Sequence, residues 1–147
     1  MSVLYADTSA IIRAYFADEP DHEPLRHLLL EGSAPVVTSE LTRVEFASAV
    51  TAAHRTQRLH EPRTVLDRFD ADCGEDGAIT LLRLDPSTVV ALARELVTSR
   101  RVRTLDAIHL AVALTDAATL ASGESVTLVT RDQNQATAAI AEGLTVS

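Results

Sequence analysis

Short apolar runs rich in Val, Leu and Ile recur along this sequence, and residues with helical periodicity separate each run from the next. Five such runs are present, at residues 3–6, 34–38, 79–84, 125–130 and 144–146. Strands that lack a polar face are typical of parallel sheets, in which helices cover both faces. We therefore predict one α/β domain over residues 1–147, with a central parallel sheet of about five strands and helices on both of its faces.

Helices are expected in every interval between the predicted strands. Asp85 and Pro86 mark the start of one of them, because Asp is a good N-cap and Pro fits the first helical turn. Thr38 or Ser39 can cap the helix that follows the second strand, and Gly143 closes the last helix. The expected helices are residues 9–16, 25–30, 41–55, 62–72, 86–100, 104–114 and 133–142.

Composition excludes several classes of protein. The single cysteine, Cys73, has no CxxC partner, which excludes a disulfide scaffold and a cysteine-built zinc site and fits a reducing compartment. With 13 basic and 21 acidic residues the formal charge is −8, and only 3% of residues are aromatic, so the chain is not expected to coat nucleic acid. The sequence has no signal-peptide pattern and no run of about 18 apolar residues, so we expect a cytoplasmic protein without membrane association.

Acidic residues follow the predicted strands at the edge where ligands bind in parallel α/β sheets. Asp7 comes directly after the first strand and Asp132 directly after the fourth. Glu45 stands in an otherwise apolar or small row of the helix after the second strand, and Asp106 lies in the first turn of the helix DAIHLAVAL. We expect these four carboxylates to converge on one side of one sheet. Because crowded like charges repel, their convergence predicts a compensating cation.

Each acid also has a structural explanation. Asp7 and Asp132 can be helix N-caps, and Asp106 can be a first-turn acid favoured by the helix dipole. Glu45 is too far into its helix to cap it, but it can reach solvent or pair with a neighbouring arginine, Arg13 or Arg43. Both kinds of interpretation stay open at this point.

Carboxylate oxygens are the ligands that Mg²⁺ and Mn²⁺ prefer, and Mg²⁺ commonly keeps several waters while it uses a few carboxylates and a substrate phosphate. Such a cation activates water for attack on phosphorus and stabilises the leaving oxygen. The acidic group therefore favours a metal-dependent phosphodiesterase.

Ser9 and His109 lie close in sequence to two of the acids. Ser9 can bind a metal-bound water or a phosphate, or it can satisfy the start of its own helix. His109 follows Asp106 by three residues, so the pair can be interpreted as a transition-metal site. We favour a packed or partly solvated histidine.

Arginines stand beside the acids, and no lysine occurs in the chain. Arg43, Arg103 and Arg131 are candidates for binding substrate phosphates, which arginine does in a bidentate manner. The alternative for the run RRVR, residues 100–103, is a solvated helix terminus stabilised by the dipole.

Four fragments, in order along nearly the whole chain, carry a resemblance to a known family. They are LYADTSAIIRAYF, SELTRVEFASAV, TLDAIHLAVAL and VTRDQNQATAAIAEGLTV. Together they resemble a PIN domain, and specifically the VapC-type toxin ribonucleases of VapBC toxin–antitoxin pairs. The last fragment departs from the family, because RDQNQA is polar where an aromatic residue or leucine often follows the aspartate.

The resemblance implies a metal-dependent endoribonuclease that cleaves structured RNA, such as tRNA or ribosomal RNA, and leaves 5′-phosphate and 3′-hydroxyl ends. It implies Mg²⁺ or Mn²⁺ as cofactor, a homodimer, and a VapB-like antitoxin that occupies the active site. On the matching motifs, Asp7 and Asp106 would be the principal metal ligands. Glu45 and Asp132 would complete the site or act through water.

Two other functions are compatible with parts of the sequence. A phospho-acceptor domain of the receiver or dehalogenase kind also has an aspartate after its first strand. The receiver pattern needs a lysine, which is absent, and the dehalogenase pattern needs Asp-x-Asp, whereas Ser9 stands two residues after Asp7. A non-catalytic PIN-like scaffold that binds a protein is disfavoured because all four carboxylates are present.

Overall fold

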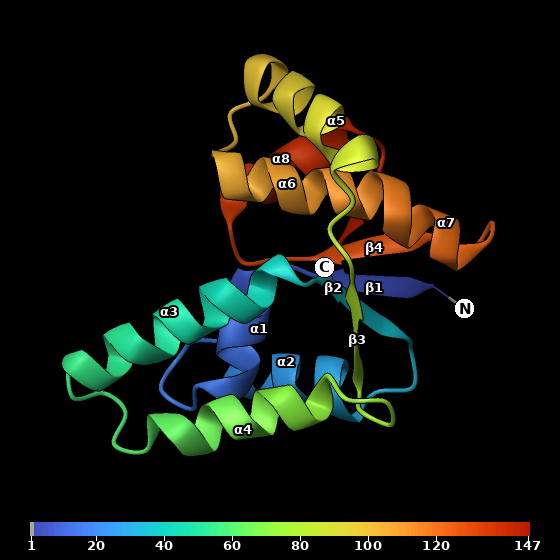
Figure 1. Cartoon of the computed structure of the whole chain (residues 1–147). Coiled ribbons are helices and arrows are strands. Elements are labelled where there is room, and N and C mark those ends of the chain that lie inside the picture. Colours follow the sequence, from blue (N-terminus) through green and yellow to red (C-terminus); the bar gives the residue numbers. More distant parts are fainter. Residues whose placement is uncertain (1) are drawn as a thin grey trace.

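The computed structural model describes residues 2–147 and contains one five-stranded, all-parallel sheet in the order β3-β2-β1-β4-β5 (Figure 1). The predicted α/β fold is therefore confirmed. The first residue of the predicted span 1–147 lies outside the described part. The strands are β1 (Val3–Ala6), β2 (Val36–Ser39), β3 (Ile79–Leu82), β4 (Val126–Val129) and β5 (Thr145–Val146).

The strand β1 lies at the centre of the sheet, with β2 on one side and β4 on the other. Leu4 is in register with Val36 of β2 and with Thr127 of β4. The chain first moves outward from β1 through β2 to β3 and then returns to β4 on the opposite side. The strand order therefore reverses between β1 and β4, and such a reversal opens a crevice at the carboxyl ends of the two strands.

Helices cover both faces of the sheet, as predicted, and right-handed crossovers decide which helix lies on which face. The lower layer in Figure 1 packs on Leu4, Ala6 and Val36, and the upper layer packs on Tyr5 and Val37. The lower layer contains α1 (Thr8–Tyr15), α2 (His22–Arg26), η1 (His27–Glu31), α3 (Leu41–Arg55) and α4 (Pro62–Asp72), and the upper layer contains α5 (Pro86–Ser99), α6 (Thr104–Val112), η2 (Ala113–Ala117), α7 (Ala118–Ala121) and α8 (Gln133–Ala141).

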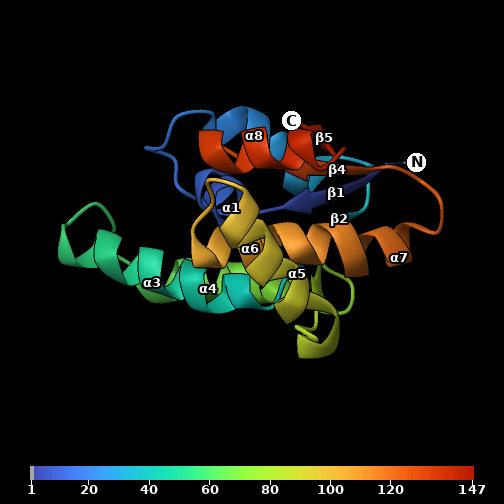
Figure 2. The same ribbon diagram turned by 90° about the horizontal axis from the view of Figure 1, so that it is seen from above.

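A cluster of aromatic rings holds α3 and α4 against α1. The rings of Phe46 and Phe69 stack at a centroid distance of 4.4 Å, and Tyr15 meets both of them edge-on. Phe46 and Phe69 are almost fully buried. This cluster fixes α3, which extends beyond the sheet at the end where α1 begins (Figure 2).

The helix predicted at residues 104–114 is longer than expected, because η2 and α7 continue it to Ala121. Ala117 and Ala121 extend its buried stripe, and the helix ends only where Ser122 and Gly123 adopt positive φ values. Over Thr104–Ala121 the mean hydropathy is 1.2, which by length and composition alone is enough to cross a membrane. That is weak evidence for a membrane segment, since the residues of this helix belong to the core between the sheet and α5.

Candidate functional site

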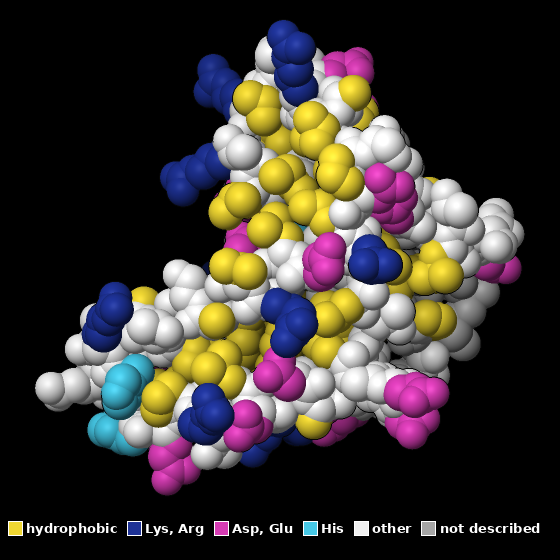
Figure 3. Space-filling model, viewed as in Figure 1, with side chains coloured by type: hydrophobic (Ala, Val, Ile, Leu, Met, Phe, Trp, Pro, Cys, Tyr) yellow, Lys and Arg dark blue, Asp and Glu magenta, His cyan; other side chains and the backbone are white. Residues whose placement is uncertain are grey.

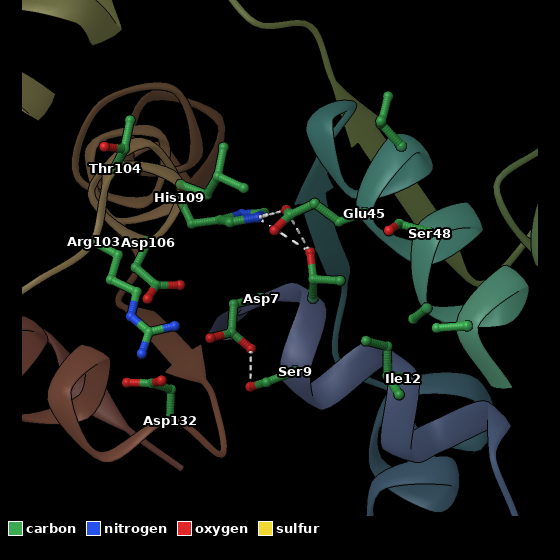
Figure 4. Close-up of a pocket in the computed structure, with 15 residues that line it drawn as sticks. Asp7, Ser9, Ile12, Glu45, Ser48, Arg103, Thr104, Asp106, His109 and Asp132 are labelled. Atoms are coloured by element: carbon green, nitrogen blue, oxygen red, sulfur yellow. Dashed lines mark hydrogen bonds and ion pairs between the residues drawn. The ribbon is translucent and has the colours of Figure 1, made fainter. Parts of the chain in front are cut away.

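A cavity of about 790 Å³ opens at the carboxyl edge of the sheet, where the strand order reverses. Residues from α1, α3, α6 and the start of α8 line it, so both helical layers contribute to its walls (Figure 4). The four carboxylates predicted to converge all line this cavity: Asp7, Glu45, Asp106 and Asp132. The sequence brings them from four separate elements because the carboxyl ends of parallel strands meet at one edge of the sheet.

Asp7 directly follows β1 and is the N-cap of α1. Its Oδ1 accepts hydrogen bonds from the Ala10 backbone N–H at 3.1 Å and from Ser9 Oγ at 2.6 Å, and its Oδ2 accepts one from Thr130 Oγ1. Burial raises the pKa of Asp7, and the hydrogen bonds from Ser9 and Thr130 oppose that rise. Asp7 is therefore an N-cap of α1, as one interpretation expected, and it also lines the cavity.

Glu45 projects from α3 toward His109 of α6. His109 Nε2 lies 2.6 Å from Glu45 Oε1, and Thr8 Oγ1 donates to the same oxygen at 2.8 Å. An ionised carboxylate only accepts hydrogen bonds, so Nε2 carries a proton. Burial alone would raise the pKa of Glu45, but the hydrogen bonds from His109 and Thr8 outweigh it and hold the pKa below its usual range.

His109 is packed, with 1% of its surface exposed, and it also joins three elements of the site. Its Nδ1 lies 2.7 Å from the hydroxyl of Tyr5 on β1, on the opposite side of the ring from Glu45. The favoured prediction of a packed histidine describes its burial but misses this role. In the sequence, only the three-residue spacing between Asp106 and His109 indicated that His109 could lie at the site.

Two threonines of the site were also missed by sequence reasoning. Thr8 is buried between Glu45 and Thr42, with its Oγ1 3.2 Å from that of Thr42, and buried Thr130 donates a hydrogen bond to Asp7 Oδ2. Both threonines directly follow a strand or its first acid, at the same sheet edge as the predicted carboxylates. This position at the strand ends could have marked the two threonines as candidate site residues.

Asp106 and Asp132 lie on the N-terminal turns of two neighbouring helices. Asp132 caps α8 by accepting a hydrogen bond from the Gln135 backbone N–H at 2.8 Å. Within residues 2–147, the Asp106 carboxylate has no hydrogen-bond or ion-pair partner. Its pKa is raised, first by burial and then by the negative charges of Asp132 and Asp7. Asp106 is therefore held beside carboxylates whose charge repels its own.

The donor set fits a hard divalent cation. In the part of the chain that the structure describes, no three Asp, Glu, His or Cys side chains lie close enough to form a complete ligand set on their own. Mg²⁺ does not need one, because it commonly binds through one or two carboxylates and keeps its remaining waters. Asp106 and the three carboxylates that raise its pKa, those of Asp132, Asp7 and Glu45, offer such donors at the cavity wall.

The three arginine candidates separate in the structure. Arg103 lines the cavity, but Arg43 lies in a neighbouring cleft, 4.0 Å from Asp70, and not among the residues that line the acidic cavity. Arg131 points to Asp21 and the Ser147 carbonyl. The prediction that Arg43 and Arg131 reach the site is therefore not supported by the geometry. The suggested pairing of Glu45 with Arg13 or Arg43 is wrong, since Glu45 bonds His109.

Comparison with known families decides which fold this is. Residues 4–141 match the PIN domain family. The chain belongs to the PIN-domain family. This confirms the resemblance found in the four sequence fragments, and the match covers every element from β1 to α8. None of the curated proteins matches the sequence of this PIN domain.

Solved structures share the fold of this PIN domain. VapC20 from Mycobacterium tuberculosis, described as a sarcin-ricin loop cleaving toxin, is 17% identical, with a TM-score of 0.63 over 96% of this chain and 95% of that chain. VapBC2 from Rickettsia felis, bound to a DNA fragment from its promoter, is 13% identical, with a TM-score of 0.63 over 99% and 97%. FitAcB from Neisseria gonorrhoeae is 20% identical, with a TM-score of 0.59 over 97% and 95%.

Removing the Thr8 hydroxyl tests the electrostatics around Glu45. In Thr8→Val we expect the pKa of Glu45 to rise, because the ionised carboxylate loses one of its two hydrogen-bond donors. Carbon-13 NMR titration of the glutamate carboxyls measures this, with Glu45→Gln to assign the signal. Thr51→Val is the control, since Thr51 lies on the same helix and bonds only the Ala47 carbonyl. An unchanged Glu45 titration in Thr8→Val would contradict the assignment.

Neutralising Asp106 should stabilise this PIN domain when divalent cations are absent. Asp106→Asn removes the repulsion from Asp132 and Asp7, and within residues 2–147 it breaks no side-chain hydrogen bond of Asp106. The side chain is partly exposed, which reduces the effect, so we expect a gain of at most about 1 kcal/mol, or about 3 °C in Tm. Thermal unfolding in EDTA measures it. A lower Tm for Asp106→Asn would show that the acid contributes to the apo fold.

Proposed function

We propose that this PIN domain is a Mg²⁺- or Mn²⁺-dependent endoribonuclease and the toxin of a toxin–antitoxin pair. The observation that carries the proposal is the convergence of four carboxylates, from four elements, in one open cavity at the point where the strand order reverses. Such a concentration of negative charge disfavours a polyanionic substrate unless a cation is bound with it. The fold shared with VapC20 supports the same activity.

We assign Asp7 and Asp106 as the principal metal ligands, with Glu45 and Asp132 completing the site or acting through water. A bound divalent cation supplies a Lewis acid that lowers the pKa of water and stabilises the leaving oxygen of the phosphodiester. Glu45 is kept ionised by His109 and Thr8, which both bond its Oε1, so its other oxygen could accept a hydrogen bond from a water and orient it.

The substrate proposed is structured RNA, such as tRNA or ribosomal RNA. Arg103 lies at the cavity wall with its side chain exposed, where it can bind a phosphate next to the scissile one. Ser9 lines the same wall, but its hydroxyl already donates to Asp7. We therefore assign phosphate binding to Arg103 and the holding of Asp7 to Ser9.

A homodimer and a VapB-like antitoxin are the proposed partners, acting in the cytoplasm. Apolar side chains gather on the face that Figure 3 shows, over α5, α6 and the adjoining part of α3. Val44, Val90 and Val97 are exposed apolar residues of these helices. Side chains of α5 and α6 also line an apolar hollow of about 280 Å³. Exposed apolar patches of this kind are typical of interaction surfaces. Light scattering should give twice the 15.8 kDa monomer mass, and a monomer at micromolar concentration would contradict the dimer.

The activity is tested by incubating partner-free protein with total cellular RNA in Mg²⁺, Mn²⁺ or EDTA and mapping new 5′ ends. We expect discrete cuts that carry 5′-phosphates, depend on the metal and disappear in Asp7→Asn. A circular dichroism melt of that variant shows whether it is folded. Intact RNA in every condition, with Mn²⁺ binding demonstrated separately, would favour the scaffold function over the nuclease. Cuts that persist in EDTA would contradict the metal dependence.

A further inference from the structure

Gln135 connects the two helix starts that carry Asp106 and Asp132. It lies in the first turn of α8 and its side chain is fully buried. Its backbone N–H donates to Asp132 Oδ1 at 2.8 Å, and its side-chain Nε2 donates to the backbone carbonyl of Asp106 at 2.9 Å. One residue therefore holds the carboxylate of one acid and the backbone of the other.

The buried amide of Gln135 is not explained by the stability of the fold. Its Oε1 is buried and has no hydrogen-bond partner among the described residues. A buried polar atom without a partner costs about 1–3 kcal/mol, whereas an apolar side chain of similar volume would have no such atom to satisfy. The Asp106 carbonyl also has a helical partner available within α6, so it does not need the Gln135 donor for its own sake.

The negative charges of Asp106 and Asp132 repel each other, and this repulsion favours a larger distance between the two helix starts. Both carboxylates line the same cavity. Figure 4 shows the guanidinium of Arg103 between the two carboxylates, but among residues 2–147 it forms no salt bridge that ties one carboxylate to the other. The Nε2 bond crosses from α8 to α6 directly behind them, where it limits how far the two helix starts can separate.

We propose that Gln135 is a positioning residue that fixes the spacing of Asp106 and Asp132 for binding of a divalent cation. This role rests on the proposed function. The amide touches neither the cavity nor a substrate and acts only through the two acids. Substitutions of groups that orient metal ligands commonly weaken metal affinity about 10–100-fold.

The test measures Mn²⁺ affinity by calorimetry, independently of RNA cleavage, in Gln135→Met and Gln135→Leu. Both variants replace the amide side chain with an apolar side chain of similar volume. We expect the Kd for Mn²⁺ to rise by about tenfold or more, with a Tm in EDTA that is equal to or above that of the unmodified protein. In cleavage assays the loss should be recovered at high Mn²⁺, because kcat of the fully loaded enzyme does not depend on the amide. Gln133→Met is the matched control, since Gln133 is exposed on the same helical turn.

Each outcome decides the role of Gln135. Unchanged Mn²⁺ affinity in two folded variants would overturn the positioning role and leave the proposed nuclease intact. Loss of folding in both variants would make Gln135 a core residue, which also overturns it. If the unmodified protein fails to bind Mn²⁺, or binds it equally well after Asp106→Asn, the proposed metal site itself is wrong.

Discussion

Asp106→Asn is expected to lower the rate of RNA cleavage by on the order of 10³-fold, because it removes the carboxylate that we propose as a cation ligand without disturbing the fold. Its carboxylate has no hydrogen-bond or ion-pair partner in the described residues, so the amide breaks no such contact. The same substitution should raise Tm in EDTA. A less active and more stable protein cannot be explained by unfolding, and it is the pattern expected of a site that is strained until a ligand binds. Initial rates at several Mn²⁺ concentrations measure the loss.

Asp116→Asn is the matched control for this prediction. Asp116 continues the same helix about three turns beyond Asp106, and its carboxylate contacts Thr88 at 3.3 Å, outside the residues that line the cavity. Its cleavage rate should equal that of the unmodified protein. Equal losses in the two variants would show that helix charge, and not the cavity, governs the activity. Full activity in Asp106→Asn would remove Asp106 from the proposed site.

Phe46→Ala is expected to destabilise the domain by about 3–5 kcal/mol, the largest effect on stability that we predict. The ring is fully buried, stacks on Phe69 and meets Tyr15 and Phe16 edge-on. Its loss leaves a cavity among α1, α3 and α4 that rigid neighbours cannot fill. For a chain of this length the change corresponds to about 10 °C in Tm. Denaturant unfolding at constant m-value measures it.

The position of Phe46 links this stability to the site, since Glu45 is the preceding residue on α3. Val44→Ala is the control, because Val44 is on the same helix and 69% exposed, and we expect a change within about 0.5 kcal/mol. If Phe46→Ala unfolds with the midpoint of the unmodified protein, the aromatic cluster does not anchor α3. Fluorine NMR of labelled phenylalanine would then show whether the ring is packed as described.

Much of the fold could be predicted from the sequence because strand identity is a local property. The run VLYA forms β1 at the predicted residues, and the remaining strands differ from prediction only at their ends. The predicted end of the helix that starts at Thr104 was wrong, because alanines are compatible with either a helix or a loop until their packing partners are known. Ala117 and Ala121 continue the helix since the core beneath them is apolar.

The site divides in a similar way. The four acids could be placed at one edge because strand ends and helix starts have fixed positions in a parallel sheet. The hydrogen bonds of His109 could not, since they join residues 64 and 104 positions apart in the chain. The directions of Arg43 and Arg131 also depend on partners from other elements, Asp70 and Asp21. Side-chain orientation across such distances is a tertiary property that local spacing does not encode.

The pairing of the central strand β1 with β4 has a consequence for synthesis of the protein. The ribosome releases β1 first, yet one edge of β1 pairs with Val126–Val129, close to the end of the chain. Until that segment emerges, β1 has an unpaired edge, Thr130 is missing from Asp7, and Asp132 does not exist. A prematurely terminated chain therefore carries no complete acidic cavity and lacks the site to which the proposed activity is assigned.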